Sequence, residues 1–99
     1  MFVVVLTYTA PLDEIDRALP DHGEWLARQY EDGHFLASGG RNPRVGGVII
    51  TRPMDRGRLD AILATDPFAV QGLATYEVIR FSPTRTAPEL RLVNEILDS

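Results

Sequence analysis

The run Phe2–Tyr8 constrains the fold of this chain most strongly. It is a series of β-branched, aromatic and other apolar residues, which favour a β-strand. The run does not alternate between apolar and polar positions, so both faces of the predicted strand are apolar. A strand of this kind is normally covered on both sides. Ala10-Pro11 ends the run.

A long helical pattern follows from about Leu12 to Asp32. Its inward positions recur at three- and four-residue spacing: Ile15, Leu19, His22, Leu26 and Tyr30, with Ala18, Trp25 and Gln29 beside them. Pro20 lies inside this pattern. It predicts the end of a short first helix and the start of the main one, because proline fits a first helical turn and breaks a helix interior. Gly33 is the expected left-handed stop.

The remaining elements are shorter. Three strands are predicted at Phe35–Ser38, Val45–Thr51 and Leu73–Phe81, and two helices at about Arg56–Ala64 and Thr86–Leu97. The second and third strands of the chain form an antiparallel hairpin around the loop Gly39–Arg44. Gly46-Gly47 weakens the start of the third strand and invites close backbone approach. Asp55 is the expected cap of the helix that follows.

The order is therefore strand, helix, strand, strand, helix, strand. This is the ferredoxin-like βαββαβ pattern, an α+β fold with an antiparallel four-stranded sheet and both helices on one face. The other face would be bare although two strands are apolar on both sides, which is unusual in a monomer. We therefore expect a homodimer in which two sheets pack face to face. We expect one domain over 1–99, with its core at about 1–82 and a tail helix at about 86–97.

Composition excludes several classes of function. The chain has no cysteine, which excludes disulfides and thiolate chemistry. Its net charge is −4 and it has no basic stripe, so neither nucleic acid nor an anionic membrane surface is an expected partner. His22 and His34 do not make a helical metal pair, and no dinucleotide or phosphate-loop signature is present, so we expect no metal and no cofactor. The apolar amino terminus is too short to span a bilayer, so we expect a cytoplasmic protein that binds a small molecule.

His22 is the strongest single anomaly, because leucine would pack better at its place in the apolar stripe. If Pro20 opens the main helix, His22 lies in the first turn, where the helix dipole favours a neutral ring. A neutral imidazole oriented by a carboxylate is a credible general base. The alternative is a partly buried histidine that is hydrogen-bonded to the backbone.

Asp66 precedes a proline and is a natural cap for a turn that starts at Pro67. Capping does not exclude a second role, since one carboxylate oxygen can cap while the other orients a histidine. The candidate ligand contacts are Ser38, Gly39, Arg41 and Phe68. The glycine allows close approach, and Arg41 and Arg44 offer charge for an anion. The alternatives are a solvated hairpin loop and, for Phe68, a place in the core.

Three segments resemble the YciI-like (YCII-related) family in their order and spacing: His22–Leu26, Glu31–Gly40 and Thr65–Leu73. The resemblance extends through about Ser82. It implies a dimeric α+β barrel of ferredoxin-like subunits, related to muconolactone isomerase-like proteins, with an active-site His–Asp pair at His22 and Asp66. One branch of that family removes chloride from a chlorinated hydroxyquinol. This chain departs from the family at Gly40-Arg41, where proline often follows the glycine, and in its tail.

The leading hypothesis is a small cofactor-independent enzyme of the lyase or isomerase type, acting on a small cyclic or carbonyl compound. His22 would transfer a proton while Asp66 fixes the tautomer of the ring. Two other functions stay open at this point. One is a non-catalytic metabolite-binding or regulatory dimer that uses the same pocket, and the other is a cofactor-free monooxygenase.

Overall fold

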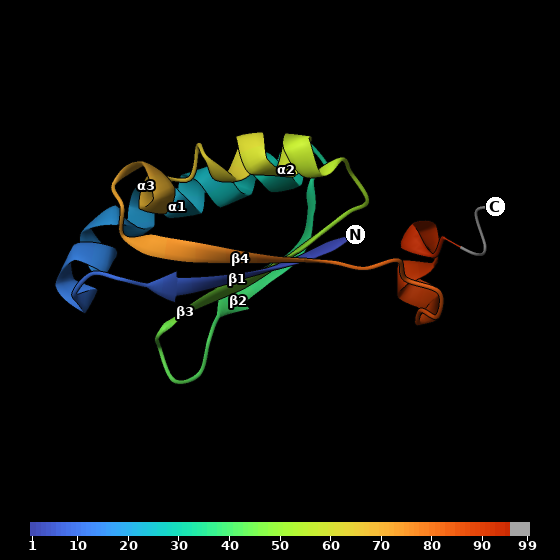
Figure 1. Ribbon diagram of the computed structural model, residues 1–99, viewed down its shortest axis with the longest axis horizontal. Helices are drawn as coiled ribbons and strands as arrows, with labels where there is room; N and C mark the ends of the chain where they lie inside the picture. Colours follow the sequence, from blue (N-terminus) through green and yellow to red (C-terminus); the bar gives the residue numbers. More distant parts are fainter. Residues whose placement is uncertain (96–99) are drawn as a thin grey trace.

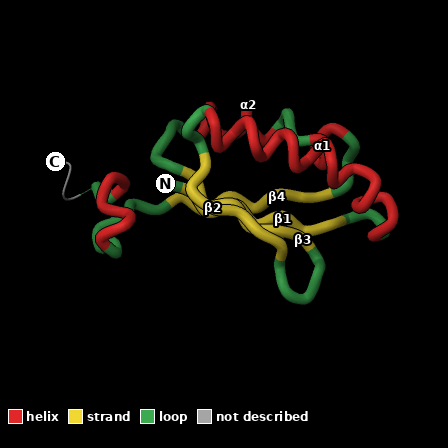
Figure 2. Tube along the Cα trace, turned by 180° about the vertical axis from the view of Figure 1, so that it is seen from behind, coloured by secondary structure: helices red, strands yellow, loops and turns green. Residues whose placement is uncertain are grey.

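The computed structural model describes residues 1–95 and has the α+β architecture expected from the sequence (Figure 1). Its strands form one antiparallel sheet in the order β2-β3-β1-β4. Their bounds are β1 Phe2–Tyr8, β2 Phe35–Gly40, β3 Gly46–Thr51 and β4 Ala74–Arg80. The helices are α1 Leu12–Glu31, α2 Arg56–Leu63 and α3 Pro67–Val70. All three helices lie on the same face of the sheet (Figures 1 and 2), as the ferredoxin-like pattern predicts.

The core lies between this helical layer and the sheet. In β1, the fully buried Phe2, Val4 and Leu6 alternate with the half-buried Val3 and Val5. Successive side chains of a strand point to opposite faces, so the buried set faces the helices. The other elements add large buried side chains to the same cluster: Trp25, Phe35, Ile49, Leu59 and Phe68.

α1 is one continuous helix, so the predicted break at Pro20 is wrong. Proline removes one intrahelical hydrogen bond and crowds the preceding turn, which bends a helix when packing holds both halves in place. Ile15 and Ala18 are buried before the proline and Trp25 after it. The amino-terminal turns, blue in Figure 1, run at an angle to the rest of α1. His22 therefore lies in mid-helix, where the dipole of a first turn does not act on it.

The buried face of α1 is shifted from the predicted stripe. The buried residues are Ile15, Ala18, Trp25 and Gln29. Leu19 and Tyr30, both expected to point inward, are 37% and 39% exposed. The predicted stripe therefore follows the edge of the core rather than its centre. Gly33, with a φ of 76°, ends the segment in the left-handed conformation as predicted.

β2 and β3 form the predicted antiparallel hairpin, but β2 is longer than expected. Gly39 and Gly40 were predicted to lie in the loop, whereas they pair with Val48 and Gly47 in the sheet. Glycine is disfavoured in strands, but this preference depends on context, and the pairing with β3 decides the outcome. The connecting loop is therefore confined to residues 41–45.

The predicted tail helix is only partly confirmed. The described residues contain a 3₁₀ segment, η1, at Pro88–Val93, which is kinked at Leu90. Val93 is buried and Leu90 is 40% exposed, while the predicted inward position Leu97 lies outside the described residues. Both views place η1 beyond the end of the sheet rather than over either face (Figures 1 and 2).

The face of the sheet opposite the helices carries an apolar cluster. Val3 of β1 pairs with Ile50 on one side and with Ile79 on the other. Two residues along β1, Val5 pairs with Val48 on one side and with the exposed Glu77 on the other, and the apolar side chains of this face are half-buried or exposed. Within residues 1–95, no helix lies on this face (Figure 1).

Gly46→Ala is expected to destabilise the fold by about 3 kcal/mol or more, at the upper end of overpacking costs. A Cβ at Gly46 would lie 1.8 Å from the carbonyl oxygen of Leu6, so the predicted close backbone approach is confirmed and β1 and β3 would have to separate. Urea unfolding followed by circular dichroism measures the change in the free energy of unfolding.

Gly57→Ala is the matched control. A Cβ at Gly57, in α2, meets nothing within 4 Å, and we expect a gain of about 0.4–1 kcal/mol from the restricted unfolded chain. Equal effects of the two substitutions would contradict the packing described for β1 and β3.

Candidate functional site

The short helix α3 positions the acidic residue of the site. Asp66 is its N-cap, and Oδ1 of Asp66 accepts a hydrogen bond of 3.0 Å from the backbone N–H of Phe68. Pro67 follows at the first helical position, where a missing N–H costs nothing. Gly72, with a φ of 67°, then reverses the chain into β4. The predicted capping role of Asp66 is thus confirmed.

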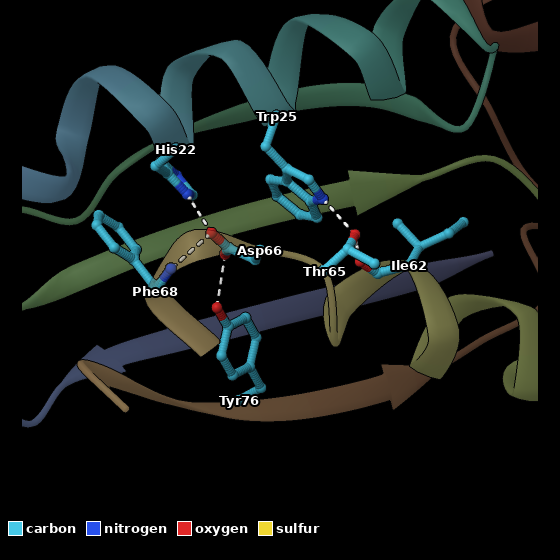
Figure 3. A network of polar contacts seen from close by, with 7 residues as sticks. All are labelled: His22, Trp25, Ile62, Thr65, Asp66, Phe68 and Tyr76. Carbon is cyan, nitrogen blue, oxygen red and sulfur yellow. Dashed lines mark hydrogen bonds and ion pairs between the residues drawn. The ribbon is translucent and has the colours of Figure 1, made fainter. Parts of the chain in front are cut away.

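His22 and Asp66 meet although 44 positions separate them in the sequence (Figure 3). Nδ1 of His22 lies 2.7 Å from Oδ1 of Asp66. The His22 side chain is 13% exposed and that of Asp66 is fully buried. The partner of the imidazole is therefore a carboxylate rather than the backbone, and the same oxygen that caps α3 also orients the ring.

Tyr76 completes the surroundings of the carboxylate, and the sequence analysis missed it. Its hydroxyl donates to Oδ2 of Asp66 at 2.5 Å (Figure 3). Burial, with the hydrogen bond to Asp66, raises the pKa of Tyr76 well above its usual value near 10, so the phenol stays a neutral donor. Tyr76 pairs with the buried Leu6 and shares its face of the sheet, but this register is visible only in the structure, so the sequence held no signal for it.

Aromatic neighbours fix the imidazole plane. The ring of His22 stacks on Phe68, with centroids 4.1 Å apart and planes 10° apart, and more loosely on Trp25 at 5.7 Å. Trp25 is itself held, since its Nε1–H donates to Oγ1 of Thr65 at 2.8 Å (Figure 3). Among the described residues, Nε2 of His22 has no hydrogen-bond partner, so this nitrogen is available to a ligand.

A cavity of about 400 Å³ adjoins His22, between α1 and the helix-facing side of the sheet. Its volume is within the range of small-molecule sites. The lining residues are Leu6, Tyr8, Leu19, His22, Leu26, Ser38, Gly39, Gly40, Arg44, Gly47, Val48, Ile49 and Phe68. This explains part of the shift in the stripe of α1, because the exposed Leu19 lines the cavity, while Leu26 both lines it and packs against the core.

The structure brings three of the four predicted ligand contacts to this cavity. Ser38, Gly39 and Phe68 line it. Arg41 does not, because its guanidinium turns toward the end of β1 and donates to Oγ1 of Thr7 at 3.1 Å. Arg44 of the same loop lines the cavity instead. The hydroxyl of Ser38 lies 2.6 Å from that of Tyr30, which is outside the predicted set.

The chemistry that this arrangement supports is proton transfer. A carboxylate on Nδ1 fixes the tautomer in which Nε2 carries a lone pair, and the same carboxylate stabilises the imidazolium that forms when Nε2 takes a proton. No group of three potential metal ligands of the His, Cys, Asp or Glu type occurs in the described part of the chain.

Tyr76→Phe is expected to cost about 1–3 kcal/mol of stability, because it leaves one oxygen of a buried carboxylate without a donor. It should also change the response to alkaline pH. Since the pKa of Tyr76 is raised in the folded chain, the unfolded chain loses this proton first, and stability falls as the pH rises above about 10. Urea unfolding at about pH 8 and about pH 11 measures both effects.

The parent chain should lose stability between these two pH values by more than the Tyr76→Phe variant does. Tyr30→Phe is the control, since it removes an exposed tyrosine hydrogen bond and should leave the alkaline loss unchanged. Identical pH dependence in the parent and in Tyr76→Phe would show that this hydroxyl is not the buried donor described here.

Comparison with known proteins adds a family and a fold. The YCII-related domain model matches residues 1–82. The chain is similar in structure to TftG, the 5-chloro-2-hydroxyhydroquinone dehydrochlorinase of Burkholderia phenoliruptrix AC1100 in complex with 2,5-dihydroxybenzoquinone. That likeness has 16% identity and a TM-score of 0.69, and it covers 84% of this chain and 95% of that chain.

SnoaB, a cofactor-independent oxygenase of Streptomyces nogalater, is similar at 23% identity and a TM-score of 0.50, covering 88% of this chain and 94% of that chain. At these identities the likenesses show the fold alone. No curated protein sequence matches the chain significantly. Among the described residues, none of the helices has both the length and the apolar character needed to cross a bilayer. The family model spans most of the sequence and confirms the resemblance seen in the motifs: this chain belongs to the YCII-related domain family.

Proposed function

We propose that this chain is a small enzyme of the lyase or isomerase type that moves a proton on a small cyclic compound without a cofactor. The observation that carries the proposal is the 2.7 Å contact between Nδ1 of His22 and a fully buried carboxylate, with Nε2 left unpaired beside the cavity. A histidine that only packs does not need a carboxylate buried for it, since burying that charge is costly.

The step can be written with its protons and electrons balanced. The lone pair of Nε2 takes a proton from a C–H or O–H group of the substrate, and the electrons of that bond stay on the substrate as an enolate or a new double bond. The imidazolium is held by Asp66. It returns the proton to another atom in an isomerisation, or the substrate expels a leaving group with its bonding electrons in an elimination. Neither outcome needs an oxidant or a reductant.

The similar structures support this class without selecting the reaction. TftG is named as a dehydrochlorinase, which agrees with elimination, and SnoaB as a cofactor-independent oxygenase. One fold supports many chemistries, so the choice rests on the site. The hydrogen-bonded His22–Asp66 pair favours proton transfer over ligand binding without reaction. The lining residues Ser38, Gly39 and Phe68 suit a flat ring with a polar substituent.

His22→Ala and Asp66→Asn are each expected to lower turnover by about 10²–10⁴-fold, the usual contribution of a positioned general base. Turnover is measured on a panel of chlorinated hydroquinones and unsaturated lactones, with oxygen consumption recorded in parallel. Binding of 2,5-dihydroxybenzoquinone is titrated on the same variants.

His34→Ala is the matched control. His34 is also half-buried, but its Nδ1 contacts Gln29 and it does not line the cavity, so turnover should not change. Binding of 2,5-dihydroxybenzoquinone that depends on His22, without turnover of any compound in the parent, would favour a metabolite-binding protein. Oxygen consumption that depends on His22 would favour a monooxygenase.

We also propose that the chain forms a homodimer through the open face of the sheet. The apolar set Val3, Val5, Val48, Ile50 and Ile79 lies together on this face in register. A contiguous apolar surface of this kind marks an interface in a protein that is not membrane-bound. A second copy of the same sheet matches it in shape and in chemistry, as in isologous dimers.

Val5→Glu is expected to convert the dimer into a folded monomer, because it buries an unpaired charge in the interface. Light scattering gives the mass in solution, and circular dichroism checks the fold. Ala61→Glu, on the exposed surface of α2, is the control and should remain a dimer. A monomeric parent chain would contradict the proposed dimer. A Val5→Glu variant that stays dimeric would show that the interface lies elsewhere.

A further inference from the structure

Arg44 is the charged side chain of the cavity that the proposed proton transfer does not use. Apart from His22, it is the only basic side chain among the described lining residues. Many of the other lining residues are apolar, with Leu6, Leu19 and Leu26 among them. A cation at the edge of an apolar cavity is a recognition element for an anionic substituent, because the rest of such a ligand can bury its ring.

The guanidinium of Arg44 forms an ion pair but does not use all of its hydrogen-bond donors. Nη2 of Arg44 donates to Oδ1 of Asp16, in the amino-terminal turns of α1. Among the described residues, its other N–H donors have no hydrogen-bond partner, although a guanidinium has five. The two side chains are 46% and 55% exposed, and an ion pair in such surroundings is worth little. The pair therefore holds Arg44, which lines the cavity, in one place without preventing a second carboxylate from binding.

The helix separates the partner of Arg44 from the proposed base. Asp16 precedes His22 by six residues on α1, which is about 9 Å of rise in a straight helix, and the bend at Pro20 lies between them. Leu19 lies between them in the sequence and lines the cavity. One six-membered ring with a carboxylate on it spans a gap of this order, with the acid at the rim and the opposite edge of the ring near Nε2.

We propose that the cavity takes monocyclic carboxylates, with Arg44 binding the carboxylate and Asp16 acting as an internal anion that competes for it. The ring lies along the apolar wall, and the edge opposite the acid faces His22. Only the part of this inference that concerns a reaction at the ring edge near His22 rests on the proposed function. The preference for an anion is a binding property and is tested without turnover.

Benzoate and benzamide are suitable probes, because they have the same shape and differ in charge. Their affinities are measured by NMR titration of the parent chain and of single variants. The parent should prefer benzoate. Arg44→Gln should weaken benzoate about tenfold and leave benzamide unchanged, since a charge-assisted contact is lost. Asp16→Asn should strengthen benzoate several-fold, because the competing charge next to Arg44 is removed.

The matched control is the ion pair between Arg17 and Asp13, also on α1 and 74% exposed on both sides. Arg17→Gln and Asp13→Asn should change neither affinity, since neither residue lines the cavity. A gain in affinity on removing Asp16 is a result that a merely structural ion pair would not give.

Three results would overturn the proposal: no benzoate binding at millimolar concentration, equal weakening of both probes by Arg44→Gln, or weaker benzoate binding in Asp16→Asn. These results are separate from failure of the proposed function. If the chain does not prefer benzoate but still shows His22-dependent turnover, only the role proposed for Arg44 is wrong. If the chain prefers benzoate but shows no turnover, the cavity binds anions in a protein that is not an enzyme of the proposed type.

Discussion

The site depends on one buried carboxylate. Asp66 accepts hydrogen bonds from three elements: from α1 through His22, from α3 through the N–H of Phe68, and from β4 through Tyr76. A buried carboxylate without donors is strongly unfavourable, so the three elements must be in place together. The same contacts join the helical layer to β4 at the end of the sheet where the cavity lies. The hydrogen bonds of Asp66 therefore stabilise both the fold and the site. In the described chain, no buried side-chain polar atom lacks a hydrogen-bond partner.

Much of the fold could be predicted because its signals are local. The apolar run in β1, the glycine stop at Gly33 and the Asp66-Pro67 turn each specify a conformation within a few residues. The two errors of the helix prediction came from tertiary packing. Burial of Ile15 and Trp25 on either side of Pro20 keeps one bent helix where local preference predicts two. Leu19 likewise lines the cavity instead of entering the core, which periodicity alone cannot show.

The His22–Asp66 pair could be predicted from an anomaly and a family resemblance, whereas its surroundings could not. Tyr76 contributes through the register of β4 against β1, which the sequence does not state. The choice between Arg41 and Arg44 depends on where β2 ends. Since pairing with β3 extends β2 through Gly40, the loop begins later, and the second arginine rather than the first reaches the cavity.

The bend in α1 has a consequence for how relatives of this chain can diverge. Pro20 cannot donate to the carbonyl of Asp16, and the turns before it lean toward the β2–β3 loop, where Asp16 meets Arg44. The position of the Asp16–Arg44 ion pair is thus set by the course of a helix and not by the groups that react. A change at Pro20 would move this ion pair while His22 and Asp66 kept their contact. Ligand selection and proton transfer can therefore change independently among chains with this architecture.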